Sequence, residues 1–489
     1  MESIKQFIRR KFSIKEIIIF IFILATLRVL IEWALLEYPI ELDGTQDYIR
    51  FYLENLYYFI IAFLLISIIL FKIAKKSFLE ITNFGIRLYP VILLPPLIDY
   101  FIYNQTKGYD YATKGNFIYN FLTISLLKGD ASNGIIIELL IAVIAIGLYT
   151  YYSRKSLLLA LISIFLTTFI IALISTPDIF FGESKGDFYY DYFLPIYYFF
   201  PLIVLSSMLY YFHSKEKLKS ILFGFRPLLA IIFILATFIG SLAAKSLGYS
   251  LNFYYVAYAI IAIFFVRQFS VVLNDIYDYN IDKISNKERP LVKKILNKEE
   301  HKNLALIFTG LAISFSAIIN LKVLFLIVLG LILGFLYSVP PFRLRKSFLG
   351  QIIIGISLIL CFAVGFLVVN DLAYILNIKN IQFCTILFFF GLVTSFTKDF
   401  KDIKGDSRNK VINFYTLFGK EKGKNIVTAL LFLVLNLPTF FIREITFLTI
   451  ALILSIITSY LYYKKGDERI VYFISSLLGI YTFIMLYYF

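Results

Sequence analysis

Long apolar runs of roughly 20 residues, separated by short polar segments, recur along the whole chain. Each run is apolar on all sides, which indicates membrane-spanning helices rather than barrel strands. The first half contains six runs, near residues 14–36, 51–71, 83–103, 133–152, 156–176 and 192–212. The second half contains nine, near residues 227–246, 251–273, 304–320, 322–339, 350–369, 381–397, 424–441, 445–463 and 469–489. The pattern predicts an all-α, polytopic membrane protein with about 15 transmembrane helices.

The charged segments between the runs predict how the chain is oriented. By the positive-inside rule, segments rich in Lys and Arg lie in the cytoplasm, so the basic start at residues 9–11 is expected there. The short basic segment 213–226 follows an even number of runs. We interpret it as a cytoplasmic linker between a six-helix domain, residues 1–212, and a nine-helix domain, residues 227–489. The charged loops of the second domain then all face the cytoplasm, at residues 274–303, 340–349, 398–423 and 464–469.

The composition agrees with an integral protein of the cell membrane, since 60% of the 489 residues are hydrophobic and 16% are charged. A net charge of +15 is compatible with nucleic-acid binding, anionic lipid or topology. Because the basic residues concentrate in loops on one side, we attribute the charge to topology and membrane lipid, and expect no nucleic-acid partner. The first run lacks a small-residue cleavage site and is expected to remain as the first span.

The first candidate site is the segment LNDIYDYNIDKISNKERPL at the inner end of an apolar run. Asn274, Asp278 and Asp282 are spaced i, i+4 and i+8, so one helix would place them on one face, about 6 Å apart. Carboxylates this close repel one another unless a cation lies among them. Oxygen ligands without His or Cys suit Mg²⁺, which also keeps water and substrate phosphate in its coordination shell. Taken alone, the segment is equally typical of a solvated helix end.

A second acidic face occurs in the segment KDFKDIKGD. Asp399, Asp402 and Asp406 are spaced i, i+3 and i+7 on another helix that leaves the membrane on the same side, and Gly405 is expected to end that helix. Two acidic helix ends at one membrane depth can hold two or three metal ions, which neutralise a diphosphate and stabilise it as a leaving group. A solvated helix end readily accounts for one acidic face. It is a much weaker explanation for two acidic faces in the same chain.

Basic residues lie between the two acidic faces. In YSVPPFRLRK, a Pro-Pro pair ends an apolar run, and the cytoplasmic boundary follows with Arg343, Arg345 and Lys346. These side chains could bind phosphate oxygens, or they could simply obey the positive-inside rule.

Arg267 lies inside an apolar run, seven residues before Asn274 and on nearly the same helix face. A bare charge there costs about 2.5–3.5 kcal/mol on insertion scales. Intramembrane charges commonly mark functional sites, although pairing with a nearby carboxylate explains Arg267 equally well.

Three motifs in this order resemble those of the UbiA superfamily of intramembrane prenyltransferases. The pattern NDxxDxxxD is met by Asn274, Asp275, Asp278 and Asp282. The second aspartate pattern is met by Asp399, Asp402 and Asp406, and YSxPPxRL by residues 337–344. The resemblance covers about residues 226–489. It implies a bundle of nine helices around a central cavity, capped by the cytoplasmic loops that carry the aspartates.

The resemblance also implies roles for individual residues. Mg²⁺ on the diphosphate of a polyprenyl diphosphate would be held by Asn274, Asp275, Asp278, Asp282, Asp399, Asp402 and Asp406. Candidate diphosphate-binding residues are Arg289, Arg343, Lys346 and Lys398. The prenyl tail would lie in an apolar tunnel, and ionisation would yield an allylic carbocation that a lipid-soluble acceptor attacks. The residues assigned to this catalytic step are Asp278, Asp402, Arg267 and Tyr337, the last through its ring face.

The chain departs from the family pattern after the second aspartate motif. KVINFY stands in place of GVxTLP, so Gly, Thr and Pro are replaced by Lys410, Asn413 and Tyr415. Pro341 stands where many members have Lys, which leaves Arg343 or Lys346 for that role. The metal site is complete by this comparison, but the acceptor stays open between a quinone precursor, a porphyrin and a glycerol-based ether lipid. KDFKDIKGD is most similar to members that serve quinone or archaeal ether-lipid synthesis.

Two alternative functions remain for the second half. Phosphoribosyl transfer to a polyprenyl phosphate belongs to a related branch, but that branch usually lacks the second aspartate motif. A non-catalytic isoprenoid-binding or transport protein, with the first half carrying the function, is the other alternative.

The first half suggests no family. Arg28 and Glu32 form an i, i+4 pair inside the first run, and further charged residues lie at or near membrane depth, at Arg87, Asp99 and Glu138. Pro95-Pro96 is expected to break the third run, as happens where membrane sites expose backbone groups. These charges predict either a polar intramembrane site or a scaffold whose buried charges pair with one another.

Overall fold

The computed structural model describes residues 11–35, 45–104, 121, 132–175, 187–369 and 374–488. The regular structure of these residues is helical, and the chain divides into two compact units, Met1–Lys215 and Glu216–Phe489. Thirteen of the described helices are long and apolar enough to cross a membrane. Two shorter apolar helices, Phe193–Met208 and Ala230–Ser246, lie where the remaining two spans were predicted. The prediction of an all-α, multi-pass membrane protein is confirmed.

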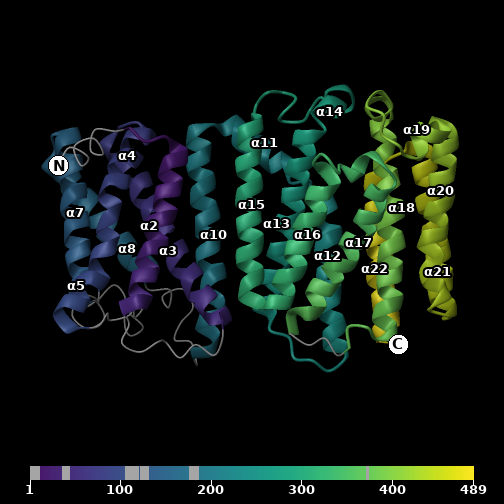
Figure 1. The fold of residues 1–489 in the computed structure, drawn as a ribbon, viewed down its shortest axis with the longest axis horizontal. Coiled ribbons are helices and arrows are strands. Elements are labelled where there is room, and N and C mark those ends of the chain that lie inside the picture. Colours follow the sequence, from purple (N-terminus) through teal and green to yellow (C-terminus); the bar gives the residue numbers. More distant parts are fainter. Residues whose placement is uncertain are drawn as a thin grey trace. The chain divides into compact units, whose positions relative to one another are not determined.

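The described residues of the first unit form six long or interrupted helical segments, which Figure 1 draws in purple to teal. Its described elements are α2 (Ile14–Leu35), α3 (Thr45–Ala74), α4 (Phe78–Leu88), η1 (Tyr89–Leu93), α5 (Leu94–Tyr103), α7 (Asn133–Arg154), α8 (Leu157–Ile174) and α10 (Asp187–His213). The predicted break in the third run is present, because α4 gives way to the 3₁₀ turn η1 before α5 begins with Pro95 and Pro96 in its first turn.

Asp99 joins this broken segment to α7. Its Oδ1 accepts a hydrogen bond of 2.8 Å from the backbone nitrogen of Gly134, in the first turn of α7. A carboxylate at a helix N-terminus is stabilised by the exposed N–H groups there. A Cβ atom on Gly134 would lie 2.5 Å from the backbone oxygen of Pro95, so the two segments require Gly at this point. Asp99 thus has a structural role that accounts for its charge.

The second unit contains nine long helices in its described residues, together with short ones. The long helices are α12 (Pro227–Ser246), α13 (Phe253–Tyr277), α15 (Lys298–Ile319), α16 (Leu321–Ser338), α17 (Leu349–Phe366), α18 (Ile378–Arg408), α20 (Lys420–Asn436), α21 (Ile445–Lys465) and α22 (Glu468–Tyr487). The short elements are α11 (Lys215–Gly224), α14 (Tyr279–Ser285), η3 (Leu344–Lys346), η4 (Leu367–Val369), α19 (Phe414–Phe418) and η5 (Leu437–Phe440). The basic segment interpreted as a linker therefore contains the helix α11.

Asparagine side chains start four of the long helices in this unit. The side chains of Asn252, Asn297, Asn320 and Asn377 accept hydrogen bonds from backbone N–H groups in the first turns of α13, α15, α16 and α18. An asparagine N-cap stabilises a helix by about 1 kcal/mol, since it satisfies a donor that has no partner within the helix.

Close packing of α12 against α17 helps to form the interior of the second unit. A Cβ atom on Gly240 would lie 2.0 Å from the backbone oxygen of Phe362, and one on Gly365 would lie 1.8 Å from that of Thr237. Small residues at such contacts let helix backbones approach closely, which drives helix association in membranes. The short helices α14 and α19 lie together at one end of this unit (Figure 1). That end carries both aspartate motifs.

Candidate active site

The first aspartate motif spans the break between two helices. Helix α13 ends at Tyr277, Asp278 caps it, and α14 begins at Tyr279. The expectation that one continuous helix carries the motif is therefore wrong. The backbone still links the motif, because Asp278 donates to the Asn274 carbonyl at 2.8 Å and Asp282 donates to the Asp278 carbonyl at 2.9 Å. Asn274 also donates its side-chain amide to the Asp278 carboxylate at 2.5 Å.

The second motif lies on one continuous helix. α18 runs on to Arg408, so the expectation that Gly405 ends it is wrong. Gly405 instead allows α18 to touch α14. Its backbone nitrogen donates to the Ser285 hydroxyl at 3.1 Å, and a Cβ atom here would lie 2.6 Å from that hydroxyl and 2.9 Å from the Ile281 carbonyl. This contact brings the two motifs together.

Asn286, just after α14, bridges the two motifs directly. Its amide nitrogen lies 2.8 Å from Oδ1 of Asp282 and 2.8 Å from Oδ1 of Asp402, so it donates to one carboxylate of each motif. Both carboxylates are buried, with exposed fractions of 5% and 7%. A buried carboxylate needs such donors to offset its desolvation.

Arg345 supplies positive charge between the two motifs. Its guanidinium forms an ion pair with Asp278 of the first motif, and it lies 3.4 Å from Asp402 and 3.8 Å from Asp406 of the second. Its side chain is 7% exposed, so Arg345 is buried although the sequence placed it at the cytoplasmic boundary. Arg343 adds a second cation, 3.0 Å from Asp278. The middle motif thus folds onto both aspartate motifs.

Two further cations, Arg226 and Arg289, form ion pairs with carboxylates of the first aspartate motif. Asp275 forms ion pairs with Arg226 at 2.5 Å and with Arg289 at 3.8 Å. Arg289 also lies 4.0 Å from Asp282. Burial raises the pKa of Asp282 to about 6, while Arg289 acts in the opposite direction. The crowding of carboxylates at this end therefore favours binding of additional positive charge.

One of the residues that depart from the family pattern takes part in this site. Asn413 caps α19 and donates its side-chain amide to Asp406 at 2.9 Å. Tyr415 is 1% exposed, and its hydroxyl is hydrogen-bonded to that of Tyr462. Asn413 thus orients a carboxylate of the second motif.

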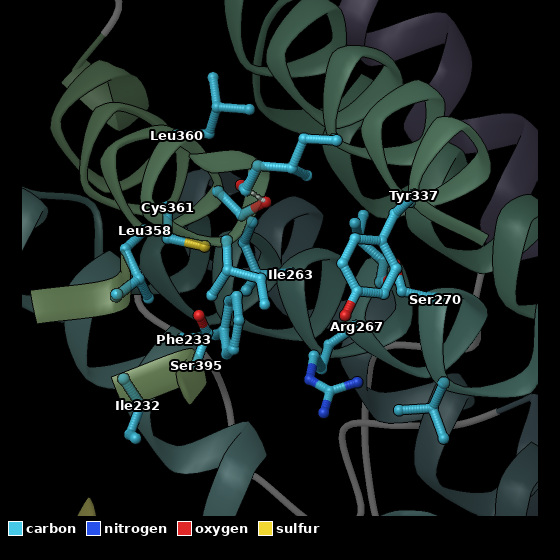
Figure 2. A pocket seen from close by; sticks show the side chains of 18 of the residues that line it. Ile232, Phe233, Ile263, Arg267, Ser270, Tyr337, Leu358, Leu360, Cys361 and Ser395 are labelled. Atoms are coloured by element: carbon cyan, nitrogen blue, oxygen red, sulfur yellow. Dashed lines mark hydrogen bonds between the residues drawn. The ribbon is translucent and has the colours of Figure 1, made fainter. Parts of the chain in front are cut away.

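A cavity of about 150 Å³ lies within the helix bundle, and Asn274 of the first aspartate motif belongs to its lining. Apolar side chains such as Ile263 and Leu358 form most of its wall, and one side carries Arg267 and Tyr337 (Figure 2). The guanidinium of Arg267 lies 5.5 Å from the centre of the Phe233 ring, a cation–π distance. In the described part of the chain, Arg267 has no carboxylate within ion-pair distance, so the simple pairing considered above is not seen.

Two further predicted residues line the same cavity. These are Asn274 and Lys398, and the ammonium of Lys398 lies 3.3 Å from the Tyr337 hydroxyl. The Lys346 side chain is exposed at the surface, and the backbone of Lys346 is hydrogen-bonded to that of Arg343 and Ile412. Asp399 is buried and close enough to Lys398, Asp402 and Asp406 for their charges to interact. The structure therefore brings together every candidate site residue except Lys346.

Sequence reasoning did not assign a site role to three residues that contact the aspartates, namely Arg226, Asn286 and Asn413, and for Arg345 it considered phosphate binding but no contact with the aspartates. Arg345 and Asn286 stand inside or directly beside the motifs, so charge and amide chemistry within a motif would have signalled them. Arg226 and Asn413 reach the site only through the tertiary fold.

The aspartate side chains have the right oxygen chemistry for a hard divalent cation. Oδ1 of Asp406 is buried, lies 3.8 Å from Arg345 and accepts no hydrogen bond from the described residues, which leaves an acceptor for such an ion. Among the described residues no three acidic, His or Cys side chains are close enough to form a ready-made metal cluster. In this arrangement Arg345 neutralises the carboxylates that the two motifs turn toward each other.

Comparison with known proteins agrees with this site. The model of the UbiA prenyltransferase family matches residues 230–477. The chain is 26% identical over 202 residues to digeranylgeranylglyceryl phosphate synthase of Sulfurisphaera tokodaii, covering 41% of this chain and 71% of that protein. It is 29% identical over 226 residues to the synthase of the same name from Saccharolobus solfataricus, covering 44% and 78%.

A solved structure of a UbiA homolog from Archaeoglobus fulgidus, bound to GPP and Mg²⁺, is also similar. It is 18% identical, covers 55% of this chain and 99% of its own, and superposes with a TM-score of 0.44. The family match extends over half of the chain and includes both aspartate motifs, the middle motif and the cavity. This chain belongs to the UbiA prenyltransferase family.

Proposed function

We propose that the second unit transfers a prenyl group from a polyprenyl diphosphate to a lipid-soluble acceptor with an anionic head group, in a reaction that requires Mg²⁺. The observation that carries the proposal is the contact of two aspartate motifs, through Asn286 and Arg345, at the mouth of an apolar cavity. The matched relatives are named for synthesis of a glyceryl phosphate, which supports a phosphate-bearing acceptor.

The diphosphate is assigned to the end of the cavity where the motifs meet. Mg²⁺ would be held there by Asn274, Asp275, Asp278, Asp282, Asp399, Asp402 and Asp406, and would stabilise the departing diphosphate. Arg343, Arg345 and Arg289 lie among these carboxylates and can bind diphosphate oxygens with paired N–H donors. Asn286 and Asn413 hold the carboxylates in place.

We assign Lys398 and Tyr337, which line the cavity, to contacts with the diphosphate and with the reacting end of the prenyl group. The Lys398 ammonium, 3.3 Å from the Tyr337 hydroxyl, can reach a diphosphate at the mouth of the cavity. The Tyr337 ring can face the positive charge that develops on the prenyl group when the diphosphate leaves. The apolar residues beyond exclude water from that charge, which protects it from hydrolysis.

Arg267 is assigned to the acceptor. It lines the cavity, lies at membrane depth and has no carboxylate partner in the described residues. An unpaired guanidinium beside an apolar wall suits an amphipathic molecule with a phosphate or carboxylate group. A neutral acceptor would leave this charge without a partner.

The distribution of Lys and Arg supports a cytoplasmic location for the amino terminus and for both aspartate motifs. The diphosphate would then enter from the cytoplasm, and the prenyl tail and the acceptor from the lipid.

The test is product formation by the full chain in lipid nanodiscs, from geranylgeranyl diphosphate and a panel of acceptors, with and without Mg²⁺. The panel contains a geranylgeranylglyceryl phosphate, its dephosphorylated alcohol and a quinone precursor with a carboxylate. We expect Mg²⁺-dependent diphosphate release with the phosphate acceptor and little with the alcohol. Equal rates with the alcohol would refute the anionic acceptor, and absence of release with every acceptor would refute prenyl transfer.

A further inference from the structure

The first unit contains a second cavity that prenyl transfer does not use. Its volume is about 120 Å³, and it lies among α2, α3, α4, η1, α7 and α8. Most of its wall is apolar, with the rings of Phe59, Phe63 and Phe84 among the lining residues. An apolar cavity of about 150 Å³ can bind benzene, and this cavity is close to that size, which suits a compact small molecule or head group.

Three polar side chains in the wall carry atoms that make no hydrogen bond within the described part of the chain. Nε and Nη1 of Arg28 and the hydroxyl of Tyr89 are buried without a hydrogen bond, and these two side chains are 3% and 7% exposed as residues. Glu138 lines the same cavity, and none of the described residues forms a hydrogen bond or ion pair with its carboxylate. Polar groups buried without a partner each cost about 1–3 kcal/mol, so a site with two such side chains beside the half-buried carboxylate of Glu138 is suited to a ligand.

The charges around the cavity are of both signs. Nη1 of Arg28 forms an ion pair with Oε2 of Glu32 at 3.4 Å. The geometry is not that of a hydrogen bond, so Nε and Nη1 keep unsatisfied N–H groups. Glu138 is near enough to Arg28 for their charges to interact, yet the two do not form an ion pair. Tyr89 is in turn close to Glu138. The wall thus presents unsatisfied donors at Arg28 and an unsatisfied acceptor at Glu138.

We infer that this cavity binds a small zwitterionic ligand, with its ammonium group facing Glu138 and Tyr89 and its anionic group facing Arg28. An ammonium group has three donors, enough for the Glu138 carboxylate and the Tyr89 oxygen. The guanidinium of Arg28 can donate two parallel hydrogen bonds to a carboxylate or a phosphate. A cation alone would leave the donors of Arg28 unsatisfied, and an anion alone would leave Glu138 unsatisfied.

The apolar wall adds a preference for a compact ligand with an apolar portion. Phe59, whose ring centre is 5.9 Å from the guanidinium carbon of Arg28, borders the anionic end. The inference does not depend on the proposed prenyl transfer, since every residue named lies in the first unit.

The experiment measures the melting temperature of the purified full chain in nanodiscs against increasing concentrations of four probes. These are leucine, isopentylamine, 4-methylpentanoate and O-phosphoethanolamine. Leucine carries both charged groups, and the next two probes each keep one. A ligand that binds only the folded state raises the melting temperature in a concentration-dependent way, which gives its Kd.

We expect leucine or O-phosphoethanolamine to stabilise the chain, and the amine and the acid to bind at least about tenfold more weakly, since each loses a charge-assisted hydrogen bond. The better of the two zwitterions identifies the anionic group as a carboxylate or a phosphate. If neither zwitterion stabilises the chain, or if the amine or the acid alone does so equally well, the inference is overturned.

Three variants test whether the zwitterion binds in this cavity. Glu138→Gln keeps the shape of the side chain and is expected to weaken zwitterion binding at least about tenfold. Glu80→Gln, an exposed carboxylate on α4 outside the cavity, should bind as the wild type does. Ala142→Leu fills the cavity while leaving its polar groups intact, and should abolish binding even if Glu138→Gln fails to fold. Unchanged binding in Ala142→Leu would overturn the inference.

Discussion

Asn286 and Asp402, 116 positions apart in the sequence, are joined by a hydrogen bond of 2.8 Å between the side-chain amide and a carboxylate oxygen. The same amide donates to Asp282. One neutral side chain therefore sets the spacing between the first and second aspartate motifs. Its contribution can be separated from that of the charged residues, because it carries no charge that could bind metal or diphosphate strongly.

Replacing Asn286 with Ala is expected to weaken Mg²⁺ activation by at least about tenfold, since side chains that orient metal ligands commonly contribute this much. The measurement is the Mg²⁺ concentration that gives half-maximal diphosphate release. Asn409→Ala is the matched control, because the Asn409 amide donates to the Gly405 carbonyl at 2.8 Å and to no carboxylate. Equal effects in the two variants would show that Asn286 only supports the local fold.

Gly405→Ala is expected to force α14 and α18 apart. The added Cβ would lie 2.6 Å from the Ser285 hydroxyl and 2.9 Å from the Ile281 carbonyl, and overpacking of this kind costs about 1–3 kcal/mol. Both thermal stability and prenyl transfer should fall. Gly310→Ala in α15 has open space around the new Cβ and should be neutral or slightly stabilising. A wild-type rate in Gly405→Ala would contradict the role assigned to this contact.

Arg267→Gln is expected to raise the KM for an anionic acceptor by at least about tenfold, the effect of losing a charge-assisted hydrogen bond. The KM for the prenyl diphosphate should change little, because Arg267 lies on the cavity wall and contacts none of the aspartates as an ion pair. Arg267→Lys should restore part of the loss. Arg443→Gln, an exposed position outside the cavity, serves as the control. A larger effect on the diphosphate KM would reassign Arg267 to the other substrate.

Much of the fold could be predicted from the sequence because the membrane imposes simple rules on it. Apolar runs of the length of a bilayer predicted the helices of both units, and the break before Pro95 followed from proline chemistry. The turn at Asp278 could not be predicted, since a spacing of i, i+4 and i+8 is compatible with one helix as well as with two. The role of Gly405 was missed for a similar reason, because a glycine near the end of a helix indicates a cap unless a second helix is known to approach.

The sequence was sufficient to predict which residues form the candidate site, but not which of these residues contact one another. Charge and spacing identified the aspartates, whereas the ion pairs of Arg345 with Asp278 and Asp402 depend on how the middle motif folds back. Arg226 had no signal of its own in the sequence, since a basic residue before an apolar run also satisfies the positive-inside rule. Which carboxylate a basic side chain pairs with depends on tertiary contacts, and the local sequence pattern carries no information about them.

The most direct test of the central claim is Mg²⁺-dependent binding of a prenyl diphosphate to the wild type, Asp278→Asn and Asp402→Asn, with Glu288→Gln as the control. Glu288 is an exposed carboxylate paired with Lys293, outside the contacts between the motifs. The account predicts that each Asp variant loses binding by at least about tenfold and loses most turnover, while the control behaves as the wild type. Full Mg²⁺-dependent binding in either Asp variant would contradict a single diphosphate site shared by the two motifs.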